Sequence, residues 1–168
     1  NLAFHFALLA ILVGVGLGSW YGWHGNRILV EGKEFCNTLA QYDESSLGPR
    51  VPDAGLPDFC LKLTDFQADF RDTGQPAGFR ATVDVSRNGP DRSVAFTVND
   101  PLRLDGASVY LLGHGYAPVV RYTDRFGASQ TATAPFLSID SNQTGEGAVL
   151  FPDVNVDPAT GARDPSLQ

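Results

Sequence analysis

A run of 20 uncharged residues, LAFHFALLAILVGVGLGSWY at positions 2–21, constrains this chain more than any other feature. At about 1.5 Å of rise per residue, a helix of this length covers the roughly 30 Å hydrocarbon core of a bilayer. A secretory signal is the competing interpretation, but its basic start, shorter apolar stretch and cleavage site are not visible. Trp20, Tyr21 and Trp23 form an aromatic cluster typical of the membrane interface. We therefore predict a transmembrane helix over residues 1–23.

A histidine, His5, interrupts the apolar run near its start. One interpretation is a neutral imidazole hydrogen-bonded to a carbonyl or hydroxyl of a neighbouring helix. The other is a ligand or proton-relay group, because ionisable residues inside a membrane mark functional sites and neutral imidazole is a common ligand of haem iron. At about 22 Å along the helix from Trp20, His5 belongs in the leaflet far from the aromatic cluster. The residue pattern alone leaves both interpretations open.

Small residues share one face of the predicted helix. At 100° per residue, one stripe contains Ala3, Ala7, Ala10, Gly14 and Gly18, and His5 lies on the opposite side. Small residues four positions apart let a second helix approach closely, although membrane helices are in general rich in Gly and Ala. We predict that this stripe packs against other transmembrane helices.

Charge divides the chain into two unlike parts. All 12 basic and 19 acidic residues lie from Arg27 onward, so the net charge of −7 belongs to that part alone. An acidic surface repels nucleic acid, and we exclude nucleic-acid binding. The excess of Arg over Lys is typical of a bacterium with a GC-rich genome. The chain begins with Asn and contains no Met, as expected for a piece of a longer polypeptide.

Beyond residue 27 the apolar residues alternate, which indicates β-strands. Residues 79–86 alternate strictly, Asn88-Gly89-Pro90 breaks the chain, and residues 94–98 alternate again, as in an antiparallel hairpin with one wet face. Residues 59–70 alternate with a slip of one residue at Thr64-Asp65, which predicts a β-bulge.

Further strands are predicted at 27–30, 108–112, 118–123, 129–133, 136–139 and 148–151, with helix only at 35–42 outside the membrane segment. Short strands separated by Gly- and Pro-rich turns favour a mainly β domain, an antiparallel β-sandwich or a partly open β-barrel. We assign this domain to residues 24–152. Residues 153–168 are polar and rich in turn formers, and we interpret them as a loop or linker toward a missing C-terminal segment.

The cysteines Cys36 and Cys60 match neither a Cys-x-x-Cys motif nor a zinc pattern. If the domain lies outside the cytoplasm, a structural disulfide is the natural interpretation, with a redox-active pair or two free thiols as alternatives. His24 and His114 are too scattered to form a metal signature with His5, and His114 between two glycines is interpreted as a turn residue. Nucleophile motifs are absent, and we predict no catalytic residue.

The order of these features is similar to the ResB family of system II cytochrome c biogenesis proteins. The resemblance is carried by Phe4-His5 at the start of the helix, by GSWYG at 18–22 and by VNDPLRLDGASVYLLGHGYAPVV at 98–120. In that family a helix with a Phe-His-Leu-Leu-type start leads into a large extracytoplasmic domain.

The resemblance implies a membrane-anchored assembly factor in the bacterial plasma membrane, with its β-rich domain on the extracytoplasmic side. Such proteins act with a ResC/CcsA-type membrane partner to deliver haem to apocytochrome c and attach it there. The family's intramembrane histidine is implicated as a haem axial ligand, and His5 is the residue that matches. The chain is then a subunit of a holocytochrome c synthase rather than a catalyst alone. The alternative is a membrane-tethered β-sandwich that binds a partner and has no haem role.

Overall fold

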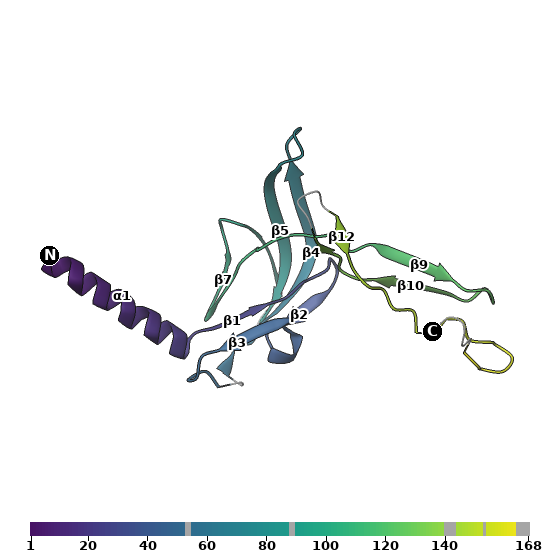
Figure 1. The fold of residues 1–168 in the computed structure, drawn as a ribbon, viewed down its shortest axis with the longest axis horizontal. Coiled ribbons are helices and arrows are strands. Elements are labelled where there is room, and N and C mark those ends of the chain that lie inside the picture. The colour runs from purple at the N-terminus through teal and green to yellow at the C-terminus, as the bar shows by residue number, and fades with distance from the viewer. Residues whose placement is uncertain (53–54, 88–89, 140–143, 153, 164–168) are drawn as a thin grey trace. The chain divides into compact units, whose positions relative to one another are not determined.

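The computed structural model describes residues 1–52, 55–87, 90–139, 144–152 and 154–163. The chain divides into two compact units, residues 1–112 and 113–168, and each is described by itself below. Figure 1 follows the chain from the N-terminal helix through the strands of the first unit to the hairpins of the second.

The first element is the predicted apolar helix, α1 (Leu2–Tyr21), and the prediction of a helix here is confirmed. Apolar side chains lie on all sides of this helix, and none of its residues is buried within the chain. Gly22 ends the helix in an extended conformation, with its N–H bonded to the carbonyl of Gly18. The chain therefore passes directly from helix to strand, as Figure 1 shows.

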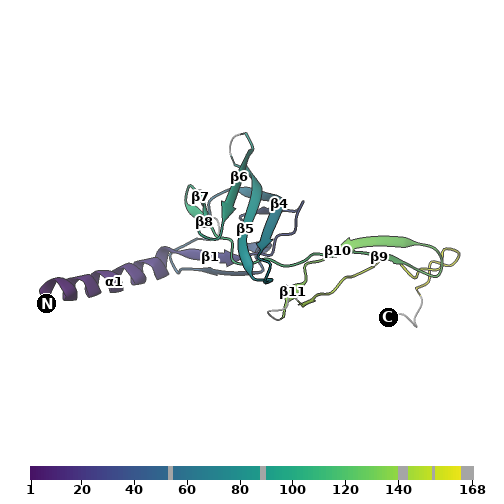
Figure 2. The ribbon, with the colours of Figure 1, turned by 90° about the horizontal axis from the view of Figure 1, so that it is seen from above.

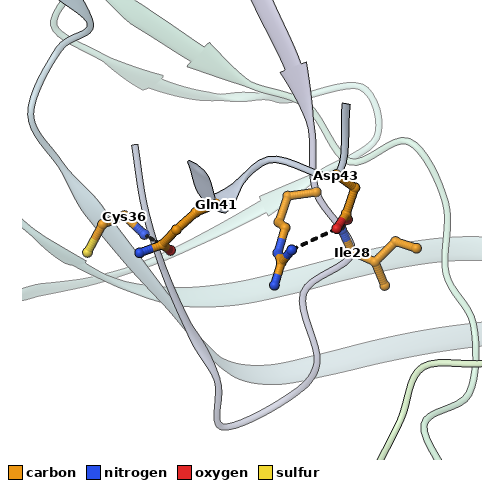
Figure 3. Close-up of polar contacts among 5 residues, drawn as sticks. Ile28, Cys36, Gln41 and Asp43 are labelled. Carbon is orange, nitrogen blue, oxygen red and sulfur yellow. Dashed lines mark hydrogen bonds and ion pairs between the residues drawn. The ribbon is translucent and has the colours of Figure 1, made fainter. Parts of the chain in front are cut away.

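A two-stranded sheet follows the helix at once. β1 (Trp23–Asn26) pairs antiparallel with β3 (Glu44–Leu47), and Trp23 lies opposite Leu47. The strand predicted at 27–30 is wrong, because the chain leaves the ladder at Asn26. The Asp43 carboxylate accepts hydrogen bonds from the Arg27 guanidinium and the Ile28 N–H, both at 2.7 Å, so a side chain replaces the strand partner there (Figure 3).

The main sheet has four antiparallel strands in the order β2-β4-β5-β6. Their bounds are β2 (Glu34–Cys36), β4 (Cys60–Phe70), β5 (Pro76–Ser86) and β6 (Arg92–Thr97). The predicted hairpin of β5 and β6 is confirmed, and so is the bulge, since the register shifts between Leu63 and Asp65. The turn predicted at Asn88-Gly89 lies outside the described residues.

The core lies on one face of this sheet. Its members come from alternate positions of β4 and β5 and from neighbouring segments: Phe35, Phe59, Leu61, Leu63, Ala81, Val83, Val85, Phe96 and Leu102. Leu102 belongs to a short hairpin of β7 (Leu102–Leu104) and β8 (Ala107–Val109), which is shorter than the strand predicted at 108–112. Strict alternation in β5 therefore buries one set of side chains and leaves the other partly exposed.

The helix predicted at 35–42 is wrong except for one short turn, η1 (Leu39–Gln41), a 3-10 helix. Its first residues instead belong to β2, which pairs with β4. The Gln41 side chain accepts a hydrogen bond from the Cys36 N–H at 2.8 Å, and the Asn37 N–H donates to the Phe59 carbonyl at 2.9 Å. These bonds to distant partners replace the i to i−4 bonds that a helix needs.

The described residues of the second unit form two hairpins. β9 (Val119–Thr123) pairs with β10 (Ser129–Thr133), as predicted, and Figure 2 shows them as a ribbon of their own. β11 (Leu137–Ser138) pairs with β12 (Gly145–Glu146), so the strand predicted at 136–139 is present in shortened form.

The strand predicted at 148–151 is wrong, because pairing ends at Glu146. Phe151 instead packs its ring against Tyr122, with the ring centres 5.6 Å apart. The fold class predicted from the sequence is nevertheless confirmed: one apolar helix precedes a mainly β, antiparallel structure, and the described strands form no closed barrel.

Candidate functional site

The helix α1 is long and apolar enough to cross a membrane by its length and composition. A helix that is apolar on all sides needs an apolar environment, which is lipid or other helices where its own chain does not cover it. The side chains of α1 are exposed within this chain, including those of Leu9, Leu12 and Val15. Its surface is therefore available to a bilayer and to partner helices.

His5 lies in the first turns of α1 with its ring held in one orientation. Its Nδ1 atom lies 2.7 Å from the carbonyl oxygen of Asn1, four residues earlier. A carbonyl oxygen can only accept, so this contact fits the tautomer with its proton on Nδ1. The other ring nitrogen, Nε2, then keeps its lone pair, which is the state in which imidazole ligates a metal.

A second contact orients the same ring. Phe4 and His5 meet edge to face, with ring centres 5.7 Å apart and planes at 86°. A hydrogen bond from the far nitrogen to a backbone carbonyl is the arrangement that fixes ligating histidines and raises their basicity as ligands. Both contacts of the His5 ring therefore come from α1 and its N-cap residue, Asn1.

The small-residue stripe lies along α1. A Cβ atom added at Gly14 or Gly18 would meet no atom of this chain within 4 Å. The stripe (Ala3, Ala7, Ala10, Gly14 and Gly18) therefore presents nearly bare backbone, which is the surface that close helix packing requires.

Cys36 and Cys60 lie opposite each other in the β2–β4 ladder and are joined by a disulfide, with Cα atoms 4.0 Å apart. The Glu34 carboxylate lies near both sulfurs, and the three ligand atoms are within 4.8 Å of one another. Thiolate, rather than disulfide sulfur, is the form that binds metals. In its bonded state this cluster is a covalent tie between two strands and no metal site.

A polar network surrounds this disulfide. The Gln41 side chain binds the Cys36 N–H, as Figure 3 shows. The buried Asn37 amide donates to the Pro57 carbonyl at 2.7 Å and accepts from the Tyr42 hydroxyl. Partial burial raises the pKa of Tyr42, because desolvation disfavours its phenolate form. The network thus fixes the chain on both sides of the short β2.

A helix–loop junction, formed by Trp20, Gly22 and residues 48–50, joins the end of α1 to the loop after β3. The Gly48 N–H donates to the Gly22 carbonyl at 2.9 Å, and the Arg50 N–H donates to the Trp20 carbonyl at 3.0 Å. The Arg50 guanidinium carbon also lies 6.0 Å from the centre of the Trp20 ring. Arg50 is not among the residues predicted from the sequence, because nothing local in the sequence relates it to Trp20.

The other two histidines, His24 and His114, lie outside α1. His24 lies in β1 opposite Ser46, and His114 lies in an irregular segment of the second unit. In the described parts of the chain, the one group of three or more His, Cys, Asp or Glu ligand atoms contains no histidine. His5 is therefore the one predicted ligand on α1, and any further ligand comes from outside it.

Comparison with known proteins settles the family. A family model described as the ResB-like family matches residues 1–166. The chain belongs to the ResB-like family. Two relatives are named cytochrome c biogenesis protein CcsB, one from Prochlorococcus marinus at 31% identity over 108 residues and one from Gloeobacter violaceus at 30% over 108 residues.

These alignments cover 63% of this ResB-like chain and 22% of each relative. The aligned part therefore spans under a quarter of the length of the curated relatives that it matches. No solved structure matches the chain. The predicted membership of the ResB family is confirmed.

Proposed function

We propose that this chain is a membrane-anchored part of an assembly factor for c-type cytochromes, and that His5 supplies one axial ligand to haem iron. The observation that carries the proposal is the contact of His5 Nδ1 with the Asn1 carbonyl at 2.7 Å, since a neutral imidazole that donates from Nδ1 has its lone pair on Nε2. The names of the CcsB relatives support the same process.

The surroundings of His5 fit haem as a ligand. Histidine imidazole is one of the common axial ligands of haem iron, and the haem macrocycle packs against apolar side chains. The exposed imidazole of His5 stands among apolar side chains of α1, and its orientation is set within the helix. When bound, haem supplies the iron centre and the group to be attached, while this chain contributes the ligand nitrogen and a membrane anchor.

The small-residue stripe provides the surface for a ResC/CcsA-type membrane partner, on the side of α1 away from His5. The chain is then anchored in the bacterial plasma membrane. Its residues 24–152 lie on the extracytoplasmic side, where they contact apocytochrome c. The Cys36–Cys60 disulfide supports this side of the membrane, because disulfides persist in oxidising compartments. In such a complex the chain acts by holding haem and substrate together, which is catalysis by proximity.

The test is the absorption spectrum of the chain purified together with its CcsA-type partner. We expect His5→Ala to lose most of the haem Soret band, and exogenous imidazole to restore it, because a small imidazole can occupy the ligand position. The matched control is His24→Ala, which removes a histidine from β1 and should keep the spectrum. If His5→Ala keeps both haem content and spectrum, the ligand role is wrong and a binding module with no haem role explains the chain better.

A further inference from the structure

A surface hollow of about 460 Å³ lies where α1 meets the β-rich part of the first unit. Its lining includes Tyr21 and Trp23 from the end of the helix, Arg50 from the junction, and Asp105 and Gly106 from the β7–β8 turn. Aromatic side chains and one cation thus line a single hollow beside the aromatic cluster of Trp20, Tyr21 and Trp23, which is typical of the membrane interface.

Arg50 is held at this level by its backbone. Its N–H donates to the Trp20 carbonyl at 3.0 Å, and its guanidinium carbon lies over the Trp20 ring, 6.0 Å from the ring centre. A cation–π contact does not use the N–H groups of a guanidinium, so these donors can bind an anion. Arg50 therefore presents donors beside the residue that marks the membrane surface.

Among the described residues, no carboxylate forms an ion pair with the Arg50 guanidinium. The ion pairs in the described ranges are Arg27–Asp43 and Arg87–Asp105. Asp105 lines the same hollow, but its carboxylate lies 3.5 Å from Arg87. The C-terminal end of α1 carries partial negative charge and therefore does not attract an anion itself. The Arg50 guanidinium is the group in this hollow that can hold one.

We propose that Arg50 binds the phosphate of an anionic phospholipid at the end of α1, with Trp20, Tyr21 and Trp23 packed beside the glycerol region. A guanidinium binds phosphate through two parallel N–H bonds, which a lysine does not reproduce. The net charge of −7 repels anionic headgroups in general, so a local cation is needed for any preference of this kind. The proposal does not depend on the haem role of His5.

The two tryptophans of the chain, Trp20 and Trp23, report on this site directly. The chain is reconstituted into phosphatidylcholine nanodiscs with a minor fraction of phosphatidylglycerol, and bromine is placed on one lipid or the other. We expect brominated phosphatidylglycerol to quench tryptophan fluorescence roughly fivefold more than its bulk fraction predicts, which is the enrichment that one basic residue produces at an anionic surface. Arg50→Ala should return quenching to the bulk fraction, and Arg50→Lys should keep part of the excess.

Arg92→Ala is the matched control, because Arg92 is an exposed arginine on β6 and should leave the excess unchanged. Quenching by brominated phosphatidylcholine checks that the tryptophans keep their depth in every variant. Equal quenching by both lipids, or an excess that survives in Arg50→Ala, overturns the proposal.

Discussion

Cys36 and Cys60 are direct partners in the β2–β4 ladder and are joined by a disulfide. β2 has only three residues and lies at the edge of the main sheet, so this covalent bond adds greatly to the few backbone bonds that hold it. The bond also closes a loop with a sequence separation of 24 that includes η1 and β3.

Replacing both cysteines, Cys36→Ser with Cys60→Ser, should lower the free energy of unfolding by about 3 kcal/mol, because the loop gains entropy in the unfolded chain. The measurement is chemical denaturation of the chain in detergent, followed by the circular dichroism of its strands. A thiol reductant should destabilise the wild-type chain and leave the double variant unchanged. Equal denaturation midpoints for the wild-type chain and the double variant would contradict the prediction.

The Tyr42 hydroxyl donates to the buried Asn37 side chain, and Tyr42→Phe removes this donor. We expect a loss of about 1–2 kcal/mol, because the Asn37 oxygen is left without a partner. Tyr110→Phe, at a tyrosine that is 58% exposed, is the matched control and should cost little.

The same tyrosine predicts how stability depends on pH. The pKa of Tyr42 is raised in the folded state, so its contribution is complete below the ordinary value of about 10 and is lost as pH rises through the folded pKa. The free energy of unfolding, measured from pH 8 to 11, should fall more steeply in the wild-type chain than in Tyr42→Phe. Parallel curves for the two proteins would show that Tyr42 is not responsible.

Local periodicity predicted the elements whose partners are close in the chain. The apolar run predicted α1, and alternation predicted β4, β5 and β6, including the bulge at Thr64. The predictions for residues 27–30 and 35–42 were wrong. These segments bind Asp43, Phe59 and Cys60, and local periodicity carries no information about contacts with residues elsewhere in the fold.

In the candidate site too, some residues can be predicted from the sequence and others only from the fold. His5 stands out in the sequence because an imidazole is rare in an apolar run. Its hydrogen bond to Asn1 follows from helical geometry, since residues four apart share a face. Arg50 lies 30 positions from Trp20 in the sequence, and only the folded path of β1 and β3 brings the two together.

Asp124 lies at the β9–β10 turn, and its two carboxylate oxygens accept hydrogen bonds from different segments of the chain. Oδ1 accepts from the N–H groups of Phe126 and Ala128, at 2.9 and 2.8 Å, while Oδ2 accepts from the Asn155 N–H at 2.8 Å. Asp124→Ala should cost the second unit about 2–3 kcal/mol, because it leaves three donors without partners.

Asp124→Asn makes a sharper test, because its amide can still accept at one atom but not at both. Hydrogen exchange followed by mass spectrometry should show faster exchange near Asn155 alone in Asp124→Asn, and at both places in Asp124→Ala. Glu146→Gln, an exposed carboxylate in β12, is the control. Equally fast hydrogen exchange at both places in both Asp124 variants would contradict these separate roles of the two oxygens.

Gly48 approaches the end of α1 so closely that a Cβ atom there would lie 2.5 Å from the carbonyl oxygens of Ser19 and Trp20. Gly48→Ala should therefore cost about 1–3 kcal/mol and open the junction, because backbone atoms must move. Gly78→Ala is the control, since a Cβ atom at Gly78 meets nothing within 4 Å. Limited proteolysis should cut the 48–52 loop faster in Gly48→Ala alone, and equal rates for the two variants would contradict this.

The stripe on α1 provides the last prediction. Gly14 lies on the stripe and Gly16 on the opposite side, yet a Cβ atom at either position meets no atom of this chain. Leucine therefore fits the isolated helix at both sites, and only packing against a partner helix can distinguish them. We expect Gly14→Leu to reduce co-purification with the CcsA-type partner about tenfold, a loss of roughly 1.4 kcal/mol, and Gly16→Leu to change it little. Equal losses in both variants would mean that the small residues do not form the packing face.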